Sequence, residues 1–297
     1  MKKTFNIIIA LLLVLVIQSC ETVVDLKTPE HKQLLVPNCF FNTDSFMVVQ
    51  LSTSKGSLDN NQKSNTVNAA TVQVFENGQI KEILQQIGDG IYKANTFKPK
   101  AGKTYHLKIN AGNYDEVDAA NTIPIPIPIN NFSFKDSAFI ESGGGGGYMA
   151  QLTLNISDPA NEQNYYAIQV FTYDTMFLNF PPGPGDTLII ARKIYAYSED
   201  PNTSYSSYAE VMMNDEIING QNYSFKINFS SYEIMPNSKI NAVLQSVSKE
   251  FFLYATTLTN QQNNQGNPFS EPVRVYSNIN KGLGIFAGFS ESTVIVR

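Results

Sequence analysis

Apolar and polar residues alternate in short runs over most of the chain, which is the pattern of β-strands that bury one face. In the run Thr104–Ala111, polar residues separate Tyr105, Leu107 and Ile109, so we expect these three side chains to face a core. Similar runs recur along the chain, with turns rich in glycine, asparagine and proline between them. This pattern predicts a mainly β fold made of β-sandwiches.

Asn77 and Gly78 stand between two β-rich runs, 71–76 and 79–85. Both residue types accept the positive φ angles of a type I′ turn. The segment therefore predicts a tight β-hairpin.

Three prolines alternate with isoleucines in Ile123–Ile129. Proline fixes φ and lacks an N–H donor, so this segment cannot be a central strand. We interpret 123–129 as a semi-rigid linker. It predicts an N-terminal β-sandwich over 34–122 and a larger C-terminal β-rich domain over 130–297.

One segment departs from the β pattern, because after Asn237 apolar residues recur at spacings of three and four. This periodicity predicts one long amphipathic helix over about 238–260, which begins at Asn237 or Ser238 as N-cap and packs across a sheet. Its apolar positions are Ile240, Val243, Leu244, Val247, Phe251, Tyr254 and Leu258.

The first twenty residues resemble a bacterial lipoprotein signal. Lys2 and Lys3 give a positive start, residues 7–17 are an unbroken apolar run, and the tripeptide Ile-Gln-Ser precedes Cys20. Eleven residues rise about 16 Å as a helix, roughly half of a bilayer core, so we expect a cleaved signal peptide over 1–19 and not a membrane span. An ordinary secretory signal with an accidental cysteine is the alternative.

Lipidation of Cys20 would tie the mature protein to a membrane. At ~0.8 kcal/mol for each buried methylene, two or three acyl chains hold far more strongly than one myristoyl chain. We expect residues 20–33 to be the lipidated cysteine and its tether.

The charge balance limits the possible partners. The 297 residues include 21 Lys and Arg against 26 Asp and Glu, for a formal charge of −5. Binding sites for the phosphate backbone of nucleic acids are formed by clustered lysine and arginine residues, so we expect no nucleic acid partner.

Cys39 is the one other cysteine, and it lies in an apolar run. We interpret it as a small core residue and not as a nucleophile.

Catalytic and cofactor motifs are absent from the sequence. Two histidines, His31 and His106, are too few for a histidine-rich zinc site, and neither a His-Glu-x-x-His nor a Gly-x-Ser-x-Gly motif occurs. We therefore expect no enzyme activity, metal or cofactor. A two-carboxylate glycoside hydrolase stays open, because such pairs are recognised only in space.

Gly282, Gly284 and Gly288 superficially resemble a dinucleotide-binding loop, but their spacing is wrong and no helix follows. We interpret them as positions of tight turns or close backbone approach.

Four tyrosines gather around a polar loop and are our candidate ligand-binding residues, since exposed tyrosine can stack on sugars or anchor proteins. The alternative is that they fill the edge of a sandwich. They are Tyr195, Tyr197, Tyr205 and Tyr208.

Three Asp-Ser/Thr-aliphatic triplets resemble the O-glycosylation sequon of exported Bacteroidetes proteins. Their hydroxyl residues are Ser137, Thr175 and Thr187.

Several motifs together resemble the DUF4249 lipoproteins of Bacteroidetes, in the expected order and over nearly the whole mature chain. They are Lys98–Tyr105, Thr122–Pro124, Asp158-Pro159 with Tyr165-Tyr166, Asp215–Gly220, Pro268–Val273, Tyr276–Ile279 and Gly282–Gly288. The resemblance implies an N-terminal immunoglobulin-like or carboxypeptidase-regulatory-like sandwich, then a larger β-rich domain. The resemblance also implies that the gene stands beside that of a TonB-dependent outer-membrane receptor, as is often so in this family. It supplies no catalytic residues.

From these observations we expect a non-enzymatic lipoprotein anchored in the outer membrane, which serves as an accessory or binding subunit of a TonB-dependent receptor. A surface adhesin or envelope structural protein is the alternative, and a glycan-active hydrolase is a third. The ligand, whether glycan or peptide, stays open, and so does the choice between the periplasmic and the cell-surface face.

Overall fold

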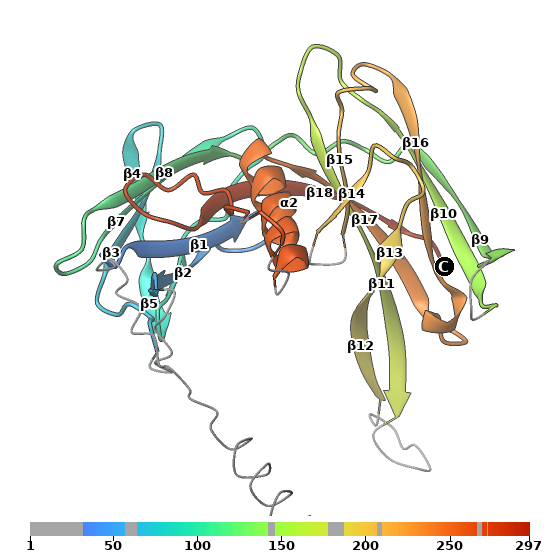
Figure 1. Ribbon diagram of the computed structural model, residues 1–297, viewed down its shortest axis with the longest axis horizontal. Coiled ribbons are helices and arrows are strands. Elements are labelled where there is room, and N and C mark those ends of the chain that lie inside the picture. The colour runs from blue at the N-terminus through green and yellow to red at the C-terminus, as the bar shows by residue number, and fades with distance from the viewer. Residues whose placement is uncertain are drawn as a thin grey trace, which may run out of the picture. The chain divides into compact units, whose positions relative to one another are not determined.

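Three β-sheets carry the fold in the computed structural model (Figure 1). The structure describes residues 32–56, 64–141, 146–177, 187–206, 210–265, 269–271 and 273–297. The predicted signal peptide, Cys20, His31 and Tyr208 lie outside the described residues. Gln33–Arg297 form one compact unit.

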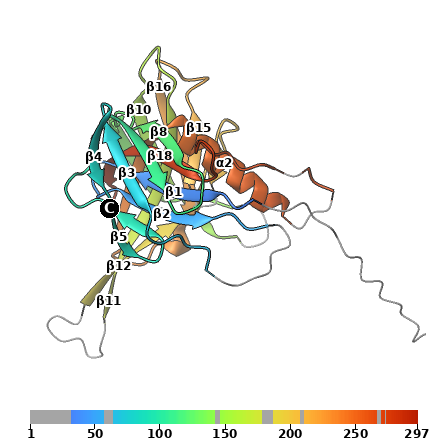
Figure 2. The ribbon, with the colours of Figure 1, turned by 90° about the vertical axis from the view of Figure 1, so that its left-hand side faces the viewer.

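The largest sheet has ten strands and joins segments from both ends of the described chain. Its order is β14 (Ser204–Ser206), β15 (Glu210–Asn214), β11 (Tyr165–Phe177), β17 (Lys239–Val247), β18 (Ile285–Ile295), β1 (Leu35–Phe41), β2 (Val48–Thr53), β6 (Ile91–Lys93) and β5 (Gln85–Gly88), and β12 (Thr187–Ile194) also pairs with β11. β18 runs parallel to β1, with Asn38 opposite Ile285, and antiparallel to β17. In Figures 1 and 2, β11 and β12 extend past the neighbouring strands.

A four-stranded sheet covers the β1–β2 side of this sheet and closes a first sandwich. Its order is β4 (Gln79–Ile83), β3 (Thr71–Glu76), β7 (Thr104–Asn110) and β8 (Val117–Thr122). Tyr105, Leu107 and Ile109 are buried in the first core, and His106 is exposed, so the predicted alternation is confirmed. The hairpin is confirmed as well, with φ of 52° at Asn77 and 75° at Gly78.

A second four-stranded sheet covers the β11–β17 side and closes a second sandwich. Its order is β13 (Ala196–Tyr197), β16 (Asn222–Ser230), β10 (Tyr148–Ser157) and β9 (Asn131–Ile140). Leu152, Ile168, Phe225 and Leu244 meet in its core. The mainly β, sandwich-like fold class predicted from the sequence is therefore confirmed.

The bounds predicted for the helix are wrong in their first half. Residues 239–247 form strand β17, and α2 (Lys249–Asn264) begins after Ser248, whose side chain accepts a hydrogen bond from Phe251 N. β17 is buried on both faces, so its apolar residues do not alternate with polar ones. A run of apolar residues in a strand that is buried on both faces also contains the spacings of three and four that are typical of a helix. The periodicity therefore predicted a helix over the whole segment, although only its second half is helical.

Helix α2 packs on the opposite side of the large sheet from the two covering sheets. Phe251 and Ala255 join Ile285 and Ala287 of β18 in a third cluster, whereas Phe286 belongs to the first core. Phe251 also meets Phe40 of β1, with ring centroids 4.9 Å apart. Within the described part of the chain, no helix is long and apolar enough to cross a membrane.

The proline-rich segment lies outside the strands and connects the two sandwiches. Ile123 is buried in the first core and Ile127 in the second, while Ile125 is 61% exposed. Ile127 N donates to the hydroxyl of Ser246 at 3.2 Å. β18 pairs with strands from both sides of this segment, and the division into two domains stays a prediction.

The glycines near the end of the chain lie where backbones approach closely, as predicted. A Cβ at Gly284 would be 2.2 Å from the carbonyl oxygen of Pro37, and one at Gly288 would be 2.9 Å from the Ile123 side chain. Both contacts hold β18 against its neighbours. A short 3₁₀ helix, η1 (Ser231–Glu233), completes the described elements.

Candidate functional site

Three of the four candidate tyrosines line one pocket, which we call the tyrosine pocket. Tyr195 lies between β12 and β13, Tyr197 is on β13, and Tyr205 is on β14. The pocket has a volume of about 440 Å³, within the range of small-molecule sites. The structure therefore brings these tyrosines together, and Tyr208 lies outside the described residues.

The tyrosine pocket also has apolar and acidic lining residues. Met149 and Phe229 are buried, and Glu141 and Glu233 complete the lining with Ser230. Glu141 directly follows β9, and Glu233 comes from η1. The pocket thus combines aromatic faces with two carboxylates.

Hydrogen bonds with Ser198 hold Tyr205 in place. The Tyr205 hydroxyl donates to the Ser198 carbonyl oxygen at 2.6 Å and accepts from Ser198 N at 2.9 Å. These bonds tie β14 to the segment after β13. They make this wall of the pocket preorganised, which lowers the cost of binding.

The field around Tyr197 is negative. Burial raises the pKa of its hydroxyl, and the nearby carboxylates of Glu141 and Glu199 raise it further. Each of these carboxylates disfavours a phenolate. The same field favours a cation.

A second hollow of about 410 Å³ is lined by Ser224, Lys226 and Asn228 of β16, whereas Phe229 of that strand lines the tyrosine pocket. It contains Glu199 and Asp200, with Lys226 as its cation. Burial opposes ionisation of Asp200, but the hydroxyl of Tyr223 donates to it and holds the pKa of that carboxyl below its usual range. Tyr223 is committed to this bond, so its hydroxyl is a structural group.

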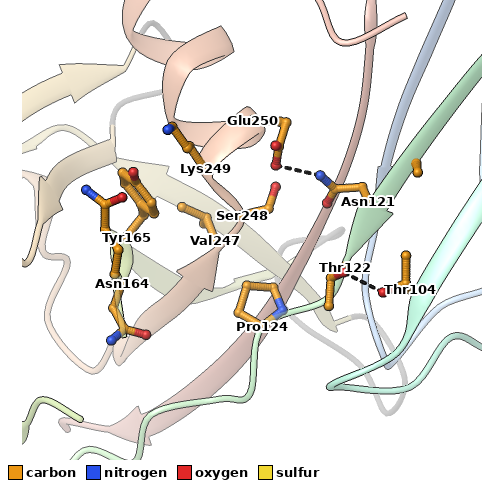
Figure 3. Close-up of a pocket in the computed structure, with 12 residues that line it drawn as sticks. Thr104, Asn121, Thr122, Pro124, Asn164, Tyr165, Val247, Ser248, Lys249 and Glu250 are labelled. Carbon is orange, nitrogen blue, oxygen red and sulfur yellow. Dashed lines mark hydrogen bonds between the residues drawn. The ribbon is translucent and has the colours of Figure 1, made fainter. Parts of the chain in front are cut away.

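Another pocket, the junction pocket, lies where β8 meets the start of α2 and has a volume of about 430 Å³ (Figure 3). One wall comes from the end of β8 and the proline-rich segment, including Thr122 and Pro124. A second wall comes from Asn164 and Tyr165 at the start of β11. Lys249 from the first turn of α2 gives a third wall.

Asn121 organises the junction pocket. Its Nδ2 donates to Glu250 Oε2 at 2.6 Å (Figure 3). Its Oδ1 accepts from Gly288 N at 2.7 Å. Glu250 is in the first turn of α2, where the helix dipole favours a negative charge. Burial raises the pKa of Tyr165, and the carboxylates of Asp215 and Glu250 add to this shift. Among the described residues that line the pocket, Glu250 is the one carboxylate, so a pair of carboxylates is not present there.

Reasoning from the sequence missed the junction pocket. Its residues come from positions 104–124, 163–165 and 247–250, and only the fold brings them together. The one local signal for this pocket is Ser248, which is the N-cap of α2. The predicted helix over about 238–260 put this serine inside a helix, so the signal was not recognised.

In the part of the chain that the structure describes, four carboxylates outside these pockets are buried and hydrogen-bonded, namely Asp158, Asp174, Glu210 and Asp215. Asp174 accepts from the Ser238 hydroxyl and pairs with Arg192 at 2.8 Å. Asp215 accepts from Asn164 N at 2.7 Å; burial raises the pKa of this carboxyl, and the carboxylate of Asp158 adds to the shift. Asp158 accepts from the Tyr166 hydroxyl and from Gly220 N. Glu210 accepts from Ser206 Oγ at 2.9 Å and forms an ion pair with Lys193 at 3.2 Å. All four carboxylates therefore connect strands or loops.

The other predicted residues are now placed. Cys39 is 1% exposed in the first core, and burial raises the pKa of its thiol, which confirms a core residue. Ser137, Thr175 and Thr187 are all exposed, so each is accessible to modification, which stays a prediction. Among the described residues, no group of three or more histidine, cysteine, aspartate or glutamate side chains could hold a metal ion.

Comparison with known proteins gives one family. The family model described as "Domain of unknown function (DUF4249)" matches residues 21–295. No curated protein matches the chain.

Proposed function

The chain belongs to the DUF4249 family, and from that premise we propose that it is a lipoprotein of the outer membrane of a Bacteroidetes bacterium, where it is a non-enzymatic binding subunit of a TonB-dependent receptor. The lipid anchor is Cys20. The body after the tether recognises either the receptor or the substrate that the receptor imports.

The anchor is supported by the order of features at the start of the sequence. A charged start, an apolar run of 11 residues and a cysteine at position 20 are those of a lipoprotein signal. The match of the family begins at residue 21, directly after that cysteine.

The tyrosine pocket is the observation that carries the binding role. Three tyrosines, two of them next to or on β13 and one on β14, line a hollow of about 440 Å³. Tyrosine supplies large contact area at a low entropy cost and is enriched where proteins bind partners. A role without catalysis is supported by the sequence, which contains neither a His-Glu-x-x-His nor a Gly-x-Ser-x-Gly motif.

Quantitative pull-down of the tagged protein from native outer membranes tests this function. We expect one TonB-dependent receptor to be enriched and to be lost with Cys20→Ala. Cys39→Ala is the matched control, because it removes a thiol and leaves the lipid anchor intact.

Other outcomes identify the alternatives. Failure to recover any outer-membrane barrel after mild crosslinking would contradict the proposal. Loss of attachment to surfaces on deletion of the gene, with nutrient uptake unchanged, would support an adhesin or an envelope structural protein. Turnover of any member of a polysaccharide panel would support a glycan hydrolase.

A further inference from the structure

The tyrosine pocket has a consistent sign of charge. Its lining includes Glu141 and Glu233, and among the described residues that line it none is a lysine or an arginine. A bound anion would meet two carboxylates without a compensating cation, and a neutral molecule would gain nothing from their charge. The charge of the pocket therefore complements a cation.

Arg192 lies near this pocket but is already paired with another carboxylate. Arg192 Nε pairs with Asp174 Oδ2 at 2.8 Å, and its Nη2 donates to the carbonyl oxygen of Glu233 at 2.9 Å. The Arg192 guanidinium thus contacts the backbone of Glu233 through a hydrogen bond and has its charge matched by Asp174. The ion pair holds Arg192 beside η1, so it does not serve as the counter-ion of the pocket.

The aromatic rings add a second attraction for positive charge. A cation over the face of tyrosine is drawn to the ring quadrupole, with about 0.5–1 kcal/mol at exposed sites and ~2 kcal/mol where water is excluded. Tyr195 is 59% exposed and Phe229 is fully buried, so the lining includes both an exposed and a buried aromatic ring. Met149 in the lining adds a polarizable thioether, which suits the methyl groups of an alkylammonium.

We propose that the tyrosine pocket binds an organic cation, either a quaternary ammonium headgroup or the ammonium of a basic peptide side chain. The rings of Tyr195, Tyr197 and Tyr205 surround the cation, and Glu141 and Glu233 supply its counter-charge. Burial raises the pKa of Tyr197, and the carboxylate of Glu141, which also lines the pocket, adds to this shift and would attract a cation. The inference rests on the proposed function as a binding subunit and gives the chemical class of its ligand.

Calorimetric titration of the full chain, purified from membranes in detergent, tests the charge of the ligand. Choline and 3,3-dimethylbutan-1-ol have the same shape and differ in charge. We expect choline to bind at least about fivefold more tightly, which corresponds to one cation–π contact or a single weak charge interaction. Nα-acetyl-lysinamide in a second arm distinguishes a peptide side chain from a quaternary headgroup, since the tighter of the two cations identifies the source.

Paired variants separate the rings from the charge. Tyr195→Ala should weaken choline binding by about threefold or more, and Tyr195→Phe should retain most of it, because the ring remains. Tyr232→Ala is the control, since Tyr232 is 80% exposed and does not line the pocket. Glu141→Gln should weaken binding and reduce its dependence on salt, whereas Glu162→Gln removes an equal charge from an exposed site and should change neither.

Three results would overturn the inference. They are equal binding of choline and its neutral isostere, unchanged binding after both Tyr195→Ala and Glu141→Gln, and tighter binding of the neutral sugar cellobiose than of either cation. Receptor recovery is scored on the same samples. A receptor recovered without cation binding refutes the ligand class alone, and cation binding without a receptor refutes the receptor association alone.

Discussion

Replacing Gly284 by alanine tests the contact that joins β18 to β1. The added Cβ would lie 2.2 Å from the carbonyl oxygen and 3.0 Å from the carbonyl carbon of Pro37. Ordinary van der Waals contact for such an atom begins near 3.4 Å, so one of the two backbones must move by more than 1 Å. Neither atom belongs to a flexible side chain that could turn away.

The magnitude has two sources. Gly284 has a φ of +103°, which L-residues adopt at a cost of about 1–3 kcal/mol. Forcing extra volume into a packed site costs a further ~1–3 kcal/mol. We therefore expect Gly284→Ala to lower the free energy of unfolding by about 2–6 kcal/mol, a large part of the 5–15 kcal/mol typical of folded proteins.

Gly112→Ala separates the two sources. Gly112 also has a positive φ, +51°, but a Cβ there would meet nothing within 4 Å. We expect this control to lose only the conformational part, about 1–2 kcal/mol.

Urea unfolding, followed by far-ultraviolet circular dichroism and tyrosine fluorescence, measures both variants. The chain has 15 tyrosines and no tryptophan, so tyrosine is the intrinsic fluorophore. If Gly284→Ala were no less stable than Gly112→Ala, the close approach of β18 to β1 would not constrain the fold, and the reasoning would be refuted.

Three further predictions concern single buried groups. Asn121→Ala leaves the buried Gly288 N–H without its acceptor and should cost about 1–3 kcal/mol in urea unfolding, and a smaller loss would mean that water replaces the amide. The Ser238 hydroxyl and then the Arg192 guanidinium lower the pKa of Asp174, so the stability that this carboxylate contributes is present above about pH 4, its unfolded pKa, and is lost as the pH falls through its folded pKa. Asp174→Asn should therefore weaken the fall of the free energy of unfolding at acid pH. An unchanged acid dependence in urea unfolding would contradict this prediction. Cys39 is buried, so in a Cys20→Ala variant a thiol reagent should label the chain only after denaturation. Rapid labelling of the folded chain would contradict this prediction.

Features set by local backbone geometry were predictable from the sequence. Asn77-Gly78 forms the expected hairpin because both residues accept positive φ, whatever packs around them. Gly284 and Gly288 were interpreted correctly as points of close approach, because glycine leaves room for a second backbone. The sequence did not reveal that the partners would be Pro37 and Ile123.

Features set by distant partners were not predictable. Residues 239–247 were expected to be helical because the sequence does not show that both faces of β17 are covered, one by the second core and the other by the third cluster. The junction pocket was missed for a related reason, since Asn121 and Glu250 are hydrogen-bonded but lie far apart in sequence. The tyrosines could be found because a short polar loop places them near one another.

The pairing of β1 with β18 also governs the order in which the protein can fold. Asn38 and Ile285 are opposite each other although about 250 residues separate them, and closing so long a loop has a high entropy cost before any contact forms. Folding dominated by such contacts is slow, on the order of milliseconds to seconds. Until β18 has been synthesised, the β1 and β17 edges that it will join stay unpaired, and unpaired edges are sites of aggregation. The nascent chain therefore needs to be kept from self-association until β18 is available to pair with both edges.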